Sequence, residues 1–197
     1  MLIANAFAGI VGIYLYWKRL KEDYSTEKIF DSGLGILFFT LLVFFGSFHF
    51  LNQYWFGLTT ISFVVILFLI SNRVKIKYNE ILDASLVLVF PLLSSFFFVD
   101  SVRRSSLSSF IAFWVLLVLI FFFYFLNTLY RSFSWYKSGK IGFSSLIVFG
   151  LLFIFRGLTS IFYKEVASFS GSLEVYISTS FVILFFLLLF NLARSKE

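Results

Sequence analysis

Long stretches without a charged residue dominate this chain, and short clusters of charged residues separate them. The stretches free of Asp, Glu, Lys and Arg run over Met1 to Trp17, Ser32 to Asn72, Ala84 to Val99, Ser105 to Tyr130, Ile141 to Phe155 and Val175 to Ala193. A helix needs roughly 20 mostly apolar residues to cross the hydrocarbon core of a bilayer. Apolar and polar residues do not alternate with a period of two, as they would in a transmembrane barrel. The pattern therefore predicts helices that span a membrane.

The second stretch is too long for one span. As a single helix from Ser32 to Asn72 it would reach about 60 Å, twice the hydrocarbon thickness. His49, Asn52 and Gln53 lie near its middle and predict a turn between two helices. We therefore predict an all-α, polytopic membrane protein with seven transmembrane helices in a single domain, residues 1–197.

Composition excludes a water-soluble domain. Hydrophobic residues make up 60% of the chain and charged residues 13%, against about 25% charged residues in soluble domains. The chain has no cysteine and one histidine, which excludes disulfides and thiolate metal sites and disfavours zinc or redox chemistry. We expect no cofactor and no metal.

The positive charges predict an orientation. Alternate predicted loops hold most of the 16 Lys and Arg residues: Lys18, Arg19, Lys21, Lys28, Arg73, Lys75, Lys77, Arg131, Lys137, Lys140, Arg194 and Lys196. The other loops hold only Arg103, Arg104 and Lys164. Lys and Arg near span ends stay cytoplasmic, so we expect the N-terminus outside and the C-terminus inside. The net charge of +6 then reflects anionic headgroups and not nucleic acid, which suits a multi-pass protein of the plasma (inner) membrane.

Arg156 lies inside the sixth predicted span, which continues past it to Tyr163. It is about 22 Å along the helix from Ile141, in the outer third of the bilayer. One interpretation is a residue that faces the helix bundle and binds a lipid phosphate or Asp100. The other is a side chain that snorkels to the outer headgroups.

Two further sets of polar residues are predicted on the outer side. Arg103 and Arg104, with Asp100, can clamp an anionic lipid headgroup through guanidinium contacts to phosphate, or form a local ion pair in a solvated loop. His49 is the candidate general base for an extracytoplasmic reaction, although a polar turn residue is the more frequent role for such a histidine. The remaining catalytic residues are unknown.

Several segments together resemble the prolipoprotein diacylglyceryl transferase family. Tyr16 to Leu20 resembles its basic end of the first helix, and Tyr24 to Asp31 the acidic linker that follows. Trp55 to Leu58 is similar to its histidine-glycine-glycine-leucine motif, and Ile81 to Pro91 to the segment before its signature helix. Gly139 to Arg156 resembles its glycine-led helix with an internal arginine. Arg156, Gly57 and Leu58 match residue by residue.

The resemblance implies seven helices, an outside N-terminus and transfer of diacylglyceryl from phosphatidylglycerol to a cysteine of a lipoprotein precursor. The chain departs from the family where Trp55 replaces a histidine, where Ser94 to Phe98 replaces an arginine-glycine-asparagine signature, and where Ser160 replaces a glutamate. We therefore expect a phosphatidylglycerol-like lipid as ligand, a lipoprotein precursor as a further partner, and no detectable transfer. The alternatives are a non-catalytic lipid-binding or scaffold subunit of a membrane complex, and a small transporter.

Overall fold

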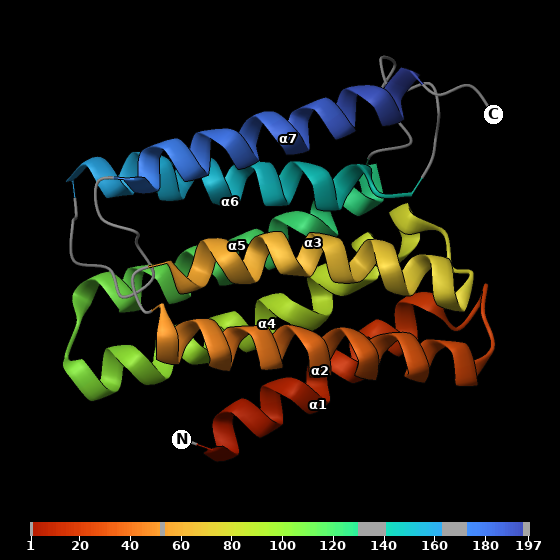
Figure 1. Cartoon of the computed structure of the whole chain (residues 1–197), viewed down its shortest axis with the longest axis horizontal. Coiled ribbons are helices and arrows are strands. Elements are labelled where there is room, and N and C mark those ends of the chain that lie inside the picture. The colour runs from red at the N-terminus through yellow and green to blue at the C-terminus, as the bar shows by residue number, and fades with distance from the viewer. Residues whose placement is uncertain (1, 52–53, 130–140, 163–172, 195–197) are drawn as a thin grey trace.

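The computed structural model describes residues 2–51, 54–129, 141–162 and 173–194, which form seven α-helices and no strand (Figure 1). The helices are α1 (Leu2–Leu20), α2 (Thr26–Phe50), α3 (Trp55–Val74), α4 (Tyr78–Arg104), α5 (Leu107–Leu129), α6 (Phe143–Phe162) and α7 (Glu174–Arg194). Figure 1 shows consecutive helices running back and forth along one axis. The predicted all-helical architecture is confirmed.

Six of these helices, α2 to α7, are long and apolar enough to cross a membrane. The chain is therefore a multi-pass membrane protein by the length and composition of its helices. The remaining helix, α1, has 19 residues and carries Lys18 and Arg19 in its last turn. Its role as a seventh span stays a prediction, as does the orientation of the bundle.

Two predicted boundaries are wrong in detail. His49 lies in the last turn of α2, which ends at Phe50, so it is not part of the turn itself; Asn52 and Gln53 lie outside the described residues. Helix α4 extends past Val99 to Arg104. It does so because Nε of Arg104 lies 2.9 Å from Oδ1 of Asp100, one helical turn earlier, and such pairs stabilise a helix end.

Helix α4 is the centre of the bundle and packs against α1, α2, α3, α5 and α6. Every residue from Ile81 to Leu88 is buried, so α4 has no lipid-facing side over this segment. The helix continues through Pro91. These five helices lie around it, α7 packs on the outside of α6, and large apolar side chains face outward, as in a bundle surrounded by lipid.

A close approach of α1 to α4 depends on glycine. A Cβ atom added at Gly12 would lie 2.7 Å from the carbonyl oxygen of Leu88, which is too close for any side chain. Small residues at such positions let membrane helices approach each other and gain van der Waals contact. Gly12 therefore allows α1 to pack tightly against the central helix.

Stacked phenylalanines join α6 to α7. The rings of Phe153 and Phe181 lie 4.5 Å apart, and those of Phe149 and Phe185 lie 5.3 Å apart, in both cases nearly parallel. All four side chains are buried. Phe149 and Phe153 are four residues apart on α6, and Phe181 and Phe185 on α7, so each pair lies on one helical face. This ladder fixes how the two helices face each other along their length.

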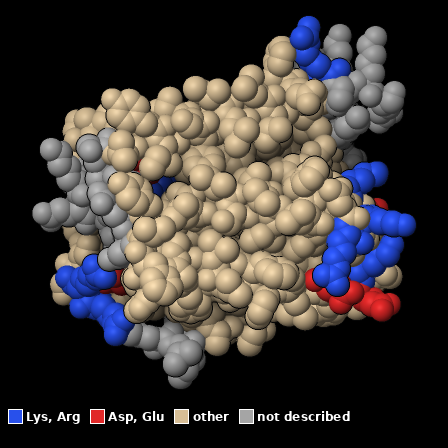
Figure 2. All heavy atoms as spheres, in the orientation of Figure 1, with Lys and Arg blue, Asp and Glu red and all other residues tan. Residues whose placement is uncertain are grey.

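On the face shown in Figure 2, charged side chains gather at the two ends of the bundle and uncharged residues cover most of the surface between. Many of the exposed side chains of the described helices are large and apolar, among them Phe38, Phe45 and Phe121. We call the end where α1 finishes and α2 begins the lysine-rich end; its described basic residues are Lys18, Arg19, Lys21, Lys28, Arg73, Lys75, Lys77 and Arg194. Arg103 and Arg104 lie at the opposite end. An apolar belt between two polar ends is the surface that a membrane protein requires.

Candidate functional site

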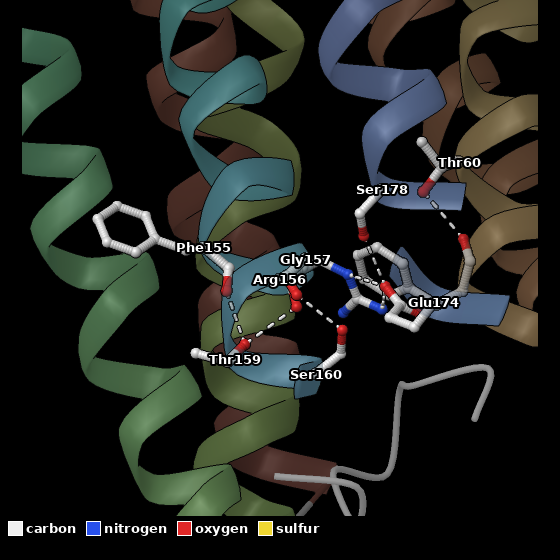
Figure 3. Close-up of polar contacts among 9 residues, drawn as sticks. Thr60, Phe155, Arg156, Gly157, Thr159, Ser160, Glu174 and Ser178 are labelled. Atoms are coloured by element: carbon white, nitrogen blue, oxygen red, sulfur yellow. Dashed lines mark hydrogen bonds and ion pairs between the residues drawn. The ribbon is translucent and has the colours of Figure 1, made fainter. Parts of the chain in front are cut away.

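Arg156 and Glu174 form a buried ion pair between α6 and α7 (Figure 3). Nη2 of Arg156 lies 2.7 Å from Oε1 of Glu174, and Nε donates to the same oxygen at 3.0 Å. The hydroxyl of Ser178 also donates to Oε1, at 2.9 Å. The side chains of Arg156 and Glu174 are 8% and 2% exposed. Each charge is compensated by the other, which is the arrangement that an ionisable residue inside a membrane needs.

A third helix contributes Phe56 of α3. The guanidinium carbon of Arg156 lies 3.6 Å from the centre of the Phe56 ring, which places the cation over the face of the ring. A cation in this position is attracted by the negative face of the aromatic system. The ion pair therefore lies at a junction of α3, α6 and α7, and its geometry is held from three sides.

The positions of these residues follow from helix periodicity. Arg156 lies three residues after Phe153 on α6, and Ser178 lies three residues before Phe181 on α7. Arg156 and Ser178 therefore lie on the same helical faces as the stacked phenylalanines. A Cβ atom at Gly157 would be 3.4 Å from Cβ of Ser178, so the helices are in close contact here. Glu174 lies in the first turn of α7, where the helix dipole favours a carboxylate.

Two positions were predicted for Arg156, one facing the helix bundle and one snorkelling to the outer headgroups. Its side chain is buried in the bundle, which agrees with the first. The predicted partner Asp100 is wrong. Asp100 binds Arg104 and accepts a hydrogen bond from Ser109 Oγ at 2.6 Å. Both oxygens of its carboxylate therefore have partners near the end of α4. The partner of Arg156 is Glu174, which sequence reasoning missed because it stands directly before the last apolar stretch, where a loop residue is expected.

Gly57 and Leu58 lie close to the same junction. Gly57 is buried, and a Cβ atom there would lie 3.6 Å from Cγ2 of Ile177 on α7. The backbone amide of Leu58 donates to the carbonyl of Tyr54 at 3.0 Å in the first turn of α3. Because Phe56 precedes Gly57 and covers Arg156, the structure brings the Gly57 segment and Arg156 together.

Arg103 and Arg104 form a separate group at the end of α4. Both residues are exposed, and the side chain of Arg104 is 63% exposed while it pairs with the buried Asp100. Arg103 and Arg104 belong to the last turn of α4 and not to a solvated loop, which was one of the two predictions for them. The local ion pair is confirmed, and Arg103 adds a second exposed cation next to it.

His49 is exposed on α2, and its ring lies 5.1 Å from that of Phe50 in an edge-on arrangement. Within the described ranges it forms no hydrogen bond or ion pair. Trp55, which stands where the resemblance expects a histidine, is 1% exposed and packs against Phe44 and Phe96. This position serves packing in the chain.

A second ion pair, between the half-buried Arg19 and the buried Asp83, lies at the lysine-rich end and was also missed. Arg19 of α1 donates through Nε and Nη2 to Oδ2 of Asp83 on α4, at 3.0 and 2.5 Å, and to Oδ1 of Asn127 on α5 at 2.7 Å. The side chain of Asp83 is 1% exposed and that of Arg19 28%. Arg19 was predicted in a cytoplasmic loop, and nothing in the sequence relates it to residues on α4 and α5.

In the part of the chain that the structure describes, no group of three or more His, Cys, Asp or Glu side chains is placed to hold a metal ion. Comparison with known proteins finds no matching family model, no matching curated protein and no matching solved structure.

Proposed function

We propose that this protein is a divergent relative of the prolipoprotein diacylglyceryl transferases that binds an anionic, phosphatidylglycerol-like lipid and does not transfer its diacylglyceryl group. In this proposal it lies in the plasma membrane with seven spans, its N-terminus outside and its C-terminus inside. The site formed by Arg156, Glu174 and Phe56 then lies in the outer half of the bilayer, where the family reaction takes place.

One observation carries the proposal: two motifs of the resemblance that are far apart in the sequence meet in space. The segment with Gly57 and the helix with Arg156 contribute to the same junction, through the contact of Phe56 with the guanidinium. The third motif, from Ile81 to Pro91, lies on the central helix α4. Buried ionisable residues inside a membrane are costly and mark functional sites, which supports a role for this junction beyond packing.

The same junction argues against transfer. Transfer to a cysteine thiol needs a group that assists removal of the thiol proton and preorganised donors for the charge that develops on the departing phosphate. The buried carboxylate of Glu174 already compensates the charge of Arg156. Trp55 is a packing residue, and the exposed His49 has no contact with the junction among the described residues.

The alternative function is a non-catalytic scaffold subunit of a membrane complex. The observation that favours it is the outer face of α2, where Phe38, Leu42 and Phe45 are 63%, 57% and 65% exposed. Lipid covers such a face equally well, so this surface alone does not require a protein partner.

The proposal is tested by incubating purified protein with phosphatidylglycerol and a peptide that carries a lipoprotein cysteine motif. We expect no lipidated peptide, together with phosphatidylglycerol retained by the protein through purification. The Arg156→Gln variant is the comparison, because it removes the charge and keeps a polar side chain that can donate hydrogen bonds. Turnover that disappears in Arg156→Gln and in His49→Ala would show an active transferase and contradict the proposal.

A further inference from the structure

An apolar groove of about 400 Å³ runs along the outside of the bundle between α5 and α6. All of its lining residues are aliphatic or aromatic, and they include Leu107, Phe110, Ile111, Trp114 and Val118 of α5 and Phe155 of α6. This volume lies within the range of small-molecule sites. The groove therefore fits an apolar chain.

The groove is separate from the buried ion pair. Figure 3 shows Phe155 pointing toward α5, whereas the neighbouring Arg156 points to Glu174 on the other side of α6. A ligand in the groove would therefore leave the ion pair untouched.

The length of the groove matches one leaflet of a bilayer. From Leu107 to Val118 the helix rises about 17 Å, at about 1.5 Å per residue. Half of the hydrocarbon core of a bilayer is about 15 Å thick. The groove begins at the opposite end of the bundle, where α4 passes into α5, and runs toward the middle of the membrane. One acyl chain of a lipid in this leaflet can thus fill it from the headgroup level inward.

Two positive charges stand a few residues before the first lining residue of the groove. Arg103 and Arg104 occupy the last turn of α4, Ser105 and Ser106 follow, and Leu107 begins α5; both arginines are exposed. Asp100 offsets one of the two charges through its contact with Arg104. Arginine binds phosphate through parallel N–H donors. The net charge of this corner favours an anionic lipid over a zwitterionic one, and over a second copy of the chain, whose corresponding corner is also basic.

We infer that the groove between α5 and α6 holds one acyl chain of an anionic phospholipid whose phosphate is bound by Arg103 and Arg104. This inference rests on the proposed function and assigns a place to its lipid. The remaining acyl chain stays in the surrounding bilayer, because the groove is open to the side.

Trp114 lies in the groove, is 52% exposed and provides a direct probe. The other three tryptophans, Trp17, Trp55 and Trp135, are replaced by Phe, and the protein is reconstituted in phosphatidylcholine vesicles. A minor fraction of the lipid is phosphatidylglycerol or phosphatidylcholine with bromine atoms on the acyl chains, which quench nearby tryptophan fluorescence. A net charge of one corresponds to roughly fivefold preferential occupancy by the anionic lipid. We expect brominated phosphatidylglycerol to be favoured by about that factor at equal mole fraction.

Arg103→Gln keeps the Asp100 to Arg104 contact that ends α4 and leaves no net charge at this corner, so the two brominated lipids should quench Trp114 about equally. In Arg103→Gln with Arg104→Gln, Asp100 keeps an uncompensated negative charge, so brominated phosphatidylglycerol should be disfavoured. Arg73→Gln with Lys75→Gln, at the lysine-rich end, is the matched control and should keep the full preference. Equal quenching in the parent protein, or a preference that persists without both arginines, would overturn the inference.

Retention of phosphatidylglycerol by the whole protein is measured in parallel. If the protein retains this lipid but Trp114 shows no preference, the groove is not the site and the proposed function stands. If it retains no phosphatidylglycerol, the proposed function fails as well.

Discussion

The guanidinium of Arg156 and the carboxylate of Glu174 meet at 2.7 Å, although the two residues are 18 positions apart and lie on different helices. Together with the contact of Arg156 to Phe56, this pair joins α3, α6 and α7. A buried pair of this kind is costly to break and less costly to remove as a whole. It therefore makes a definite prediction about stability.

Replacing Glu174 by Leu should lower the free energy of unfolding by about 3 to 5 kcal/mol, because it leaves the charge of Arg156 buried without its carboxylate. The double variant Arg156→Met with Glu174→Leu should recover much of this loss. Unfolding in mixed micelles, followed by tryptophan fluorescence, provides the measurement, with the exposed Glu27→Gln as control. A double variant that loses as much as the sum of both single variants would show that the two residues act independently.

Gly12 of α1 tests the close packing of α1 on α4, and Gly46 of α2, which has open space around it, is the control. Gly12→Ala places a Cβ atom 2.7 Å from the carbonyl oxygen of Leu88, and the required shift of α1 should cost about 1 to 3 kcal/mol. Gly46→Ala meets no atom within 4 Å and should leave stability equal or raise it by up to about 1 kcal/mol. The same unfolding assay compares the two. Equal effects would mean that α1 does not pack closely on α4.

Asp83→Asn should reduce stability by about 1.5 to 3 kcal/mol, the range for a hydrogen bond to a charged group. Position 83 is buried, and the substitution keeps the shape of its side chain there. It removes the negative charge that binds Arg19. Lys77→Gln is the comparison, because Lys77 is 81% exposed and its pair with Glu80 should contribute about 1 kcal/mol or less. The account of this second ion pair fails if Lys77→Gln is the more damaging of the two substitutions.

The orientation of the protein in the membrane can be determined by labelling single introduced cysteines, because the chain has no cysteine of its own. Glu22 lies between α1 and α2 at the lysine-rich end, and Ser105 follows α4 at the opposite end; both are exposed. An impermeant maleimide added to intact cells should label Ser105→Cys and spare Glu22→Cys, since basic ends stay cytoplasmic. Membranes opened with detergent should give labelling of both. The reverse pattern in intact cells would invert the proposed topology.

The helices themselves were predictable, because length and absence of charge follow directly from the thickness of the membrane. The division of the long stretch between Ser32 and Asn72 was also correct, since no single span can be that long. The extension of α4 was missed, although Asp100 and Arg104 are four residues apart and such a pair favours a helix. That signal was present in the sequence and was assigned to a loop.

The partners of Arg156 and Arg19 were not predictable from the sequence. Arg156 was recognised as a residue that needs a partner, but the choice of Glu174 depends on how α6 and α7 face each other. The stacking of Phe153 on Phe181 sets that relation. In the same way, Arg19 and Asp83 are 64 positions apart, and only the packing of α1 on α4 brings them together. Ion pairs between different helices depend on how the helices pack, which the order of residues along the chain does not give.

Headgroup selectivity tests the central claim most directly. Purified protein is exchanged into nanodiscs with equal amounts of phosphatidylglycerol and phosphatidylcholine, and the lipids that stay bound after gentle release are identified by native mass spectrometry. We predict that phosphatidylglycerol is retained preferentially, and that this preference falls in Arg103→Gln with Arg104→Gln but not in Arg73→Gln with Lys75→Gln. Retention of both lipids in the ratio of the nanodisc, or of neither lipid, would contradict the proposal that this protein binds an anionic phospholipid.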